Sequence, residues 1–373
     1  MSRLTPSVIA LVTAAGLAAP AIAADWQEEA PSVDESGYGQ FRDAYPVTPG
    51  QWAGLGDEDD PIRIEFGARY WYSMGSGVVD DSSGTNLLST SDTSHIGEGF
   101  LRIEDHSTNT FAKAIAGYSI AIDGTYSTPV DSGSIADGEI GYVGADFGWH
   151  VFGNNQGSGV GFLGGYQYWH EGANSGRNNF AVVTGDPIPY DTATGQTFIP
   201  LDSASNSIDA HMLRLGVEAR ADLGFIDFTG ELAAVPYAKV DGVVGIEEVS
   251  FDALGPYAGP AQPPYDGVAN GNISYMRTSA TAMDGWGYGA QAEAWLGVHP
   301  IENMTMRVGA RAWYLQGVAD QTYSAASFGN PGDTEPDGVY DIDPSVNESN
   351  WITESNPFRM FRYGLMAELN YRF

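Results

Sequence analysis

Apolar and polar positions alternate along much of the chain, and the alternation is clearest at the C-terminus. Odd positions from 361 to 373 are Phe, Tyr, Leu, Ala, Leu, Tyr and Phe, and even positions include Arg362, Glu368 and Arg372. A period of two over this length is typical of a β-strand with one apolar and one polar face. In a membrane, such a strand separates lipid from a polar interior. The pattern therefore predicts a strand in the wall of a transmembrane barrel.

The same alternation recurs between residue 62 and the C-terminus. We expect strands at 62–74, 96–105, 110–122, 139–152, 159–170, 207–222, 225–241, 283–298, 304–317 and 358–373. The connections alternate between long segments, rich in Gly, Ser, Asp and Pro, and short turns, as in outer-membrane barrels, whose strand number is even. The fold class is thus all-β, a transmembrane antiparallel β-barrel of ten strands. Extended stretches within 171–206 and 242–282 leave twelve strands as the alternative.

The N-terminus has the pattern of a secretory signal peptide. Arg3 precedes an apolar stretch from Val8 to Ile22, and small residues follow at the expected cleavage point after Ala23. The stretch is too short for a membrane helix, which needs about 20 apolar residues. We predict a signal peptide at 1–23, an acidic periplasmic segment at 24–61, and a barrel with five long extracellular loops at 62–373.

The chain ends on an aromatic residue, Phe373, two positions after Tyr371. This ending resembles the C-terminal signal by which Gram-negative bacteria deliver outer-membrane β-barrels to their assembly machinery. The resemblance implies that Tyr371 and Phe373 form the assembly signal and that the chain resides in the bacterial outer membrane. It also implies three partners: the barrel-assembly machinery, membrane lipid and lipopolysaccharide.

The charges are sorted by strand parity. The chain carries 48 acidic and 16 basic residues, a net charge of −32, which argues against nucleic acid as a partner. Most basic residues nevertheless lie at the polar positions of the alternating strands, together with a similar number of acidic residues. These predicted lumen-lining positions are Arg63, Glu65, Arg69, Glu98, Arg102, Glu104, Lys113, Asp146, Arg214, Glu218, Arg220, Asp222, Glu231, Lys239, Glu293, Arg307, Arg311, Arg362, Glu368 and Arg372.

Interleaved Arg and Glu predict an ion-paired interior. Barrels of about eight strands are filled by their own side chains, and open aqueous channels appear at about 16–18 strands. Ten strands therefore favour a narrow water path over a wide pore. Trp71, Trp169, Trp295 and Trp313 share the lumen parity, and we expect them to fill the interior beside the charges. Tyrosines and tryptophans of the opposite parity are expected at the two membrane interfaces.

The size and loop pattern resemble two ten-strand families, the omptins and the Opc-type adhesins. Omptins are surface proteases whose site pairs two carboxylates with an Asp–His couple. The nearest match here is Asp209-Ala210-His211, with Asp80, Asp81 and Asp123 as loose carboxylate candidates. Such a couple orients a histidine to activate water. Because Asp209 and His211 have the lipid-facing parity, we assign no catalytic residue.

The sequence also gives only weak evidence for metal ligands. His95, His170 and His211 are expected near one rim, which is a pattern that can bind a metal. Asp341 and Asp343 resemble part of a calcium loop, but position 346 is Val where that loop needs Gly. We predict no metal site and no cofactor, with Ca²⁺ or Mg²⁺ at the acidic loops as the alternative.

Three functions follow from these observations. The first is a narrow porin-like channel for small solutes or ions, lined by the Arg and Glu positions. The second is a non-enzymatic surface or adhesin-type barrel that acts through its loops. The third is an omptin-like surface hydrolase.

Overall fold

The computed structural model describes residues 61–128, 132–153, 158–182, 190–191, 196–197, 201–244, 276–301, 303–328 and 346–372. The predicted signal peptide, the acidic segment up to residue 60, the candidate calcium loop and Phe373 lie outside these ranges. Within them, no helix is long and apolar enough to cross a membrane.

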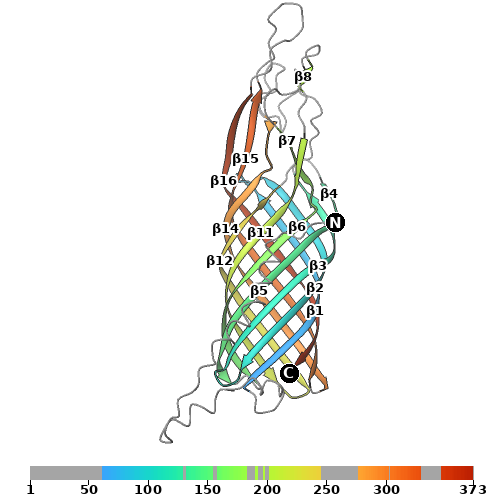
Figure 1. Ribbon diagram of the computed structural model, residues 1–373, viewed down its shortest axis with the longest axis vertical. Helices are drawn as coiled ribbons and strands as arrows, with labels where there is room; N and C mark the ends of the chain where they lie inside the picture. Colours follow the sequence, from blue (N-terminus) through green and yellow to red (C-terminus); the bar gives the residue numbers. More distant parts are fainter. Residues whose placement is uncertain are drawn as a thin grey trace, which may run out of the picture. The chain divides into compact units, whose positions relative to one another are not determined.

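Ten long antiparallel strands form a closed ring (Figure 1). Around the ring they are β1 (Ile62–Asp80), β2 (Asn86–Asp105), β3 (Thr110–Ser127), β5 (Gly138–Gly153), β6 (Gly159–Ala173), β11 (Ser207–Asp222), β12 (Ile226–Val243), β14 (Ala282–Ile301), β15 (Met304–Phe328) and β16 (Val346–Arg372). The last strand pairs antiparallel with the first, so the wall has no free edge at membrane depth. The prediction of a ten-strand barrel is confirmed, and the twelve-strand alternative is wrong for this ring.

Six short strands lie outside the ring. They are β4 (Ser132–Ile135), β7 (Arg177–Ala181), β8 (Tyr190–Asp191), β9 (Gln196–Thr197), β10 (Leu201–Ser205) and β13 (Met276–Arg277). β4 extends β3, β13 adds to β15, and the other four form the pairs β7–β10 and β8–β9. The extended stretches that suggested twelve strands are therefore hairpin extensions and not parts of the wall.

Several strands continue well beyond the predicted ends. β1 and β2 pair from Ile62 to Asp80, although 75–95 was expected to be a loop. The continuation is rich in Ser, Thr and Gly, so it lacks the apolar alternation that marks a strand in lipid. β15 and β16 likewise extend past the rest of the ring as a two-stranded ribbon (Figure 1). This end of the barrel, the predicted extracellular end, is thus more ordered than the sequence indicated.

The turns at both ends are closed by local hydrogen bonds. In the β1–β2 connection, the Ser83 hydroxyl and the Thr85 backbone N–H donate to Asp81, and these bonds lower the pKa of Asp81. At the opposite end, the Leu223 N–H donates to the Ile226 carbonyl over 2.9 Å. Gly224 between them has a φ of 89°, a left-handed conformation that favours glycine.

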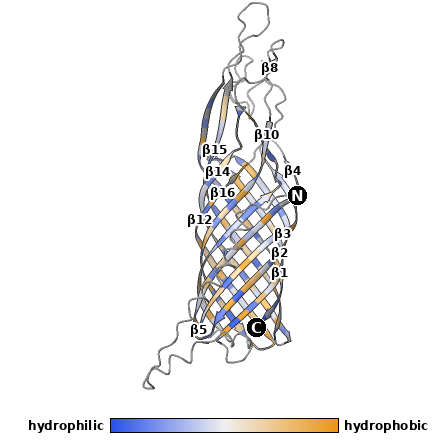
Figure 2. Ribbon diagram, in the orientation of Figure 1, coloured by the Kyte–Doolittle hydropathy of each residue, from blue (hydrophilic) through white to orange (hydrophobic). Residues whose placement is uncertain are grey.

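Hydrophobic and hydrophilic residues alternate along the strands of the barrel (Figure 2), and the hydrophobic ones include many large side chains on the outward face. Leu215, Val308 and Leu365 are each at least 60% exposed, and many other large apolar side chains share this face. Such a surface would be unfavourable in water by roughly 25 cal/mol for each Å² of apolar area. Because the wall is closed and its outside is apolar, the barrel is built to span a membrane.

Aromatic side chains at the outer edge of the band are fixed by polar partners. The Tyr70 hydroxyl lies 2.5 Å from His95 Nδ1, and the Tyr166 hydroxyl lies 2.5 Å from His211 Nδ1. Tyr and Trp prefer this boundary because one end of the ring system is apolar and the other is polar. His95 and His211 therefore belong to interfacial pairs on different sides of the ring, not to one metal-binding group.

Replacing Leu369 with arginine should destabilise the barrel by about 2–4 kcal/mol, because a cation would then face the lipid. Leu369 is outward on β16, opposite Ala68 of β1. Ile352→Arg is the matched control, since Ile352 is also exposed on β16 but pairs only with the extension of β15. The control should change stability by less than about 0.5 kcal/mol. Urea unfolding in lipid vesicles measures both, and equal losses would contradict the membrane placement.

Candidate functional site: the filled lumen

The predicted lumen-lining positions face the interior, with two exceptions. Asp222 lies at the periplasmic end of β11, where its carboxylate accepts a hydrogen bond from the Gly224 N–H. Lys239 points outward from β12. The remaining positions of the set lie inside the ring, and most of them are connected by ion pairs across strands that are distant in sequence.

The inward placement expected for Lys239 is wrong because β12 contains a bulge. The register of β12 against β14 shifts between Val235 and Ala238, which exchanges the two faces of the strand from that point on. Lys239 is half-exposed, and its Nζ lies 3.4 Å from Asp284 and 3.9 Å from Asp241. Pro236 could have indicated this bulge in the sequence, because proline within a strand pattern often marks a bulge.

The periplasmic part of the lumen is a network of ion pairs. Arg102 donates from both terminal nitrogens to Glu218, over 2.7 and 2.6 Å, and from Nε to Glu104 over 2.6 Å. Arg307 binds Glu65 over 2.8 Å and Asp227 over 2.9 Å. Paired carboxylate and guanidinium groups compensate one another's burial. Asp227 was not among the predicted positions.

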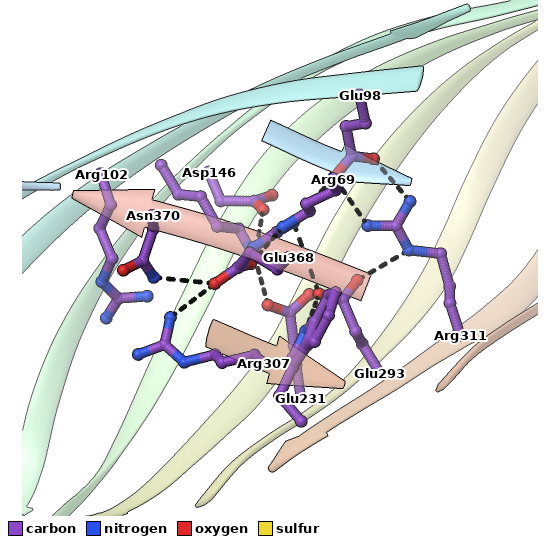
Figure 3. A network of polar contacts seen from close by, with 12 residues as sticks. Arg69, Glu98, Arg102, Asp146, Glu231, Glu293, Arg307, Arg311, Glu368 and Asn370 are labelled. Atoms are coloured by element: carbon purple, nitrogen blue, oxygen red, sulfur yellow. Dashed lines mark hydrogen bonds and ion pairs between the residues drawn. The ribbon is translucent and has the colours of Figure 1, made fainter. Parts of the chain in front are cut away.

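A second network occupies the middle of the barrel (Figure 3). Arg69 bridges Glu368 on β16 and Glu98 on β2, over 2.5 and 2.8 Å. Arg311 on β15 bridges the same Glu98 and Glu293 on β14, each over 2.7 Å. On the neighbouring strands, the same layer continues through the ion pairs Arg214–Asp146, Arg214–Glu231 and Lys113–Glu231.

An aromatic layer lies above these charges. Tyr142 stacks on Trp169 with ring centroids 5.1 Å apart, and Trp169 meets Trp313 edge-on at 4.6 Å. Trp71 is fully buried beside them. The Tyr142 hydroxyl donates to Glu98 over 2.6 Å, which joins this layer to the ion pairs below. The tryptophans thus lie where they fill the lumen and do not stand free to stack on a sugar.

Toward the extracellular end, Arg362 is the centre of a further buried cluster. It donates to both oxygens of Asp92 over 2.9 Å, and to Ser73, Ser94 and Glu171. Above it the lumen is aliphatic and aromatic, lined by Leu88, Ile122, Ile140, Met283 and Phe358, all buried. Asp92 and Glu171 were not predicted, because their strand segments lie in the stretches first read as loop or rim.

The described lumen contains little free space. The ion-paired side chains of the middle layer are no more than 15% exposed, and Glu98 and Glu368 are fully buried. The cavity among Arg69, Trp71 and Glu293 measures about 20 Å³, and a second, near Glu171, about 40 Å³. A water molecule needs about 10–15 Å³ on this scale, so each of these spaces holds only about one to four waters.

The Asp209–His211 pair does not form a catalytic couple. Asp209 instead contacts His170 Nδ1 over 2.8 Å and accepts a hydrogen bond from the Tyr168 hydroxyl, while His211 contacts Tyr166. All of these groups lie on the outward face. Asp80, Asp81 and Asp123 belong to β1–β3 and their connection, away from β11 in the ring. Among the residues the structure describes, no group of three or more His, Asp or Glu is arranged to hold a metal ion.

A row of outward-facing aspartates crosses four neighbouring strands just beyond the aromatic belt. Asp209 is opposite Asp241, Asp241 is opposite Asp284, and Asp284 is opposite Asp320. Like charges directly opposite one another in a sheet are unfavourable, and Lys239 offsets part of this repulsion. The extracellular rim is therefore strongly acidic on this side.

The fold is similar to solved outer-membrane barrels. The outer-membrane protease OmpT from Escherichia coli matches with a TM-score of 0.50 and 8% identity, over 84% of this chain and 97% of that one. The translocator domain of the autotransporter NalP from Neisseria meningitidis matches with a TM-score of 0.33 and 10% identity, over 87% and 92%. A Pseudomonas aeruginosa FadL homologue gives a TM-score of 0.23 and 9% identity, over 84% and 90%. No protein-family model and no curated protein sequence matches the chain.

Arg102→Met should destabilise the barrel by about 3–5 kcal/mol, because Glu218 would remain buried without its guanidinium partner. Glu104 would keep its pairs with Arg220 and Arg63. Adding Glu218→Gln to Arg102→Met should therefore recover part of the loss. Lys239→Met, which removes an exposed pair, should change stability by less than about 1 kcal/mol. Unfolding in lipid vesicles tests the series; a double variant no more stable than Arg102→Met would contradict the pairing.

Proposed function

We propose that this chain is a sealed, non-enzymatic outer-membrane surface barrel, and that it conducts no solutes. One observation carries the proposal: the lumen is filled by two ion-paired networks, an aromatic layer and an apolar layer. The narrow channel expected from the sequence is therefore not the function that the geometry supports best. The second function named there, a surface or structural barrel, is the one we adopt.

Buried charge pairs do not make a permeation path by themselves. A solute that passes through a pore needs side chains that water already reaches, because stripping an ion of water without replacement is very unfavourable. Here Arg69, Arg311 and their carboxylate partners are bound to each other and shielded from solvent. Opening a path would require several of these pairs and the aromatic contacts above them to separate together.

The extracellular end supports a role at the cell surface. The β15–β16 ribbon and the continuations of β1 and β2 present ordered sheet beyond the apolar band, next to the acidic row from Asp209 to Asp320. Adhesion to a surface and contribution to envelope integrity are both compatible with this display. The lipid partners we propose, including lipopolysaccharide, would meet the outward aromatic belt, and the assembly machinery would recognise the C-terminal residues Tyr371 and Phe373.

The hydrolase alternative has no geometric support. His211 is engaged with Tyr166 on the outward face, and the Asp209 carboxylate is bound to Tyr168 and His170. A general base must reach the proton it removes in a substrate complex. No second carboxylate pair faces Asp209 across a cleft in the described part of the chain.

The refolded mature protein should give no discrete conductance steps in a planar lipid bilayer, because its lumen is closed at several levels. A general-diffusion porin in the same bilayers serves as the positive control for insertion and detection. Insertion of the protein is verified independently by its protection from protease in vesicles. Reproducible single-channel steps from inserted protein would overturn the sealed-barrel proposal and restore the channel.

The purified protein should also show no protease or esterase activity above background, and His211→Ala should not change that rate. The reason is that His211 faces outward and its Nδ1 is already in contact with the Tyr166 hydroxyl. Hydrolysis of a peptide or ester substrate that disappears in His211→Ala would contradict this expectation.

A further inference from the structure

A hollow of about 310 Å³ opens on the outward face of the barrel, across β14, β15, β16 and the end of β1. Its walls include three exposed aromatic side chains, Trp286, Tyr288 and Tyr314. The Tyr314 hydroxyl donates to Gln316 Oε1, and Gln316 Nε2 donates to the Tyr288 hydroxyl, each over 2.7 Å, so both tyrosines are held in place. The remaining lining residues are Asp80, Gly317, Val318, Pro357, Phe358 and Arg359. The volume is in the usual range for ligand sites, about 300–1,000 Å³.

The hollow contains one cation and one carboxylate that do not form an ion pair with each other. Arg359 is exposed on β16, and among the described residues its guanidinium has no hydrogen bond or ion pair. Asp80 lies on β1 two residues beyond Val78, which is opposite Arg359, and it accepts a long hydrogen bond of 3.3 Å from Asn86. Diagonal neighbours of this kind are about 7–8 Å apart. A small group that carries both charges can therefore lie between the two side chains.

The position of the hollow determines what can fill it. Tyr288 and Tyr314 belong to the aromatic belt, which lies at the membrane–water interface. The row of aspartates passes just beyond the hollow, with Asp284 opposite Asp320. The hollow is thus at the height of the lipid headgroups, and a bilayer supplies its occupant. Because carboxylates lie beside it, a headgroup with a net negative charge is disfavoured.

We propose that this hollow binds a lipid whose headgroup carries one phosphate and one primary amine. The phosphate lies on Arg359, because a guanidinium matches phosphate with two parallel hydrogen bonds. The ammonium points toward Asp80 and the aspartate row, and the glycerol region lies against Trp286 and Tyr288, whose rings suit such a boundary. The site is on the outside of the wall, so it does not depend on whether the lumen conducts.

The test is native mass spectrometry of the refolded mature protein in neutral detergent micelles that contain equal amounts of phosphatidylethanolamine and phosphatidylglycerol with the same acyl chains. We expect one phosphatidylethanolamine to be retained, with a preference on the order of tenfold, since one charge-assisted contact distinguishes the two lipids. Free O-phosphoethanolamine at the same concentration should not displace the lipid, because it lacks the acyl chains. Displacement would overturn the assignment to a lipid and identify a soluble ligand with the same two charged groups.

Two variants test the two charges separately. Arg359→Gln should reduce the retention of both lipids about tenfold, because the contact with phosphate is lost. Asp80→Asn should retain both lipids equally, because only the amine distinguishes them. Arg177→Gln removes another exposed guanidinium, on β7 outside the ring, and should behave as the parent does.

The folded state of each variant is checked by its heat-modifiable mobility in a gel, which should not change because Arg359 is exposed and Asp80 lies at the end of its strand. Equal retention of the two lipids by the parent protein would overturn the proposal. Retention by folded Arg359→Gln at the parent level would also overturn it, because the phosphate would then bind elsewhere.

Discussion

The pairing of buried charges inside the closed wall is the interaction on which the remaining structure depends. A ten-strand ring is too narrow to leave its inward side chains in bulk water, so every Arg and Glu on that face must find a partner within the lumen. Arg307 meets Glu65 and Arg69 meets Glu368 only when β16 has closed on β1. The ion pairs therefore form together with the ring, and a slip of one residue in any strand would turn charged side chains toward lipid.

The order of the side-chain layers along the barrel determines whether water can pass through the lumen. The ion pairs fill the part of the lumen below Trp71 and Trp169, and Tyr142 connects the two layers through its hydrogen bond to Glu98. Above them, the interior changes from polar to apolar around Phe358 and Met360. A water path would have to cross all of these layers. The layers therefore close the described part of the lumen at several heights.

The alternation of apolar and polar residues was enough to predict the fold, the number of strands and the inward face of most of them, because one lipid-facing surface is a strong constraint on sequence. It failed where that constraint ends. Lys239 was misplaced because the bulge after Val235 exchanges the faces of β12. Asp92 was missed because its segment consists of small polar residues and has no apolar signal, and Glu171 was missed because it lies one residue beyond the predicted end of its strand. The aspartate row could not be predicted either, since it depends on the register between strands.

The Arg362 cluster differs from the other layers in having two carboxyl groups in contact with one guanidinium. Asp92 alone would satisfy Arg362, with Ser73 and Ser94 completing its hydrogen bonds. Glu171 adds a second carboxyl group to a guanidinium that is already paired, and its other oxygen accepts a hydrogen bond from Trp169 Nε1. An additional buried charge lowers stability unless something neutralises it. A buried carboxyl group can take up a proton, so a second acid beside Arg362 needs no second cation to be tolerated in the lumen.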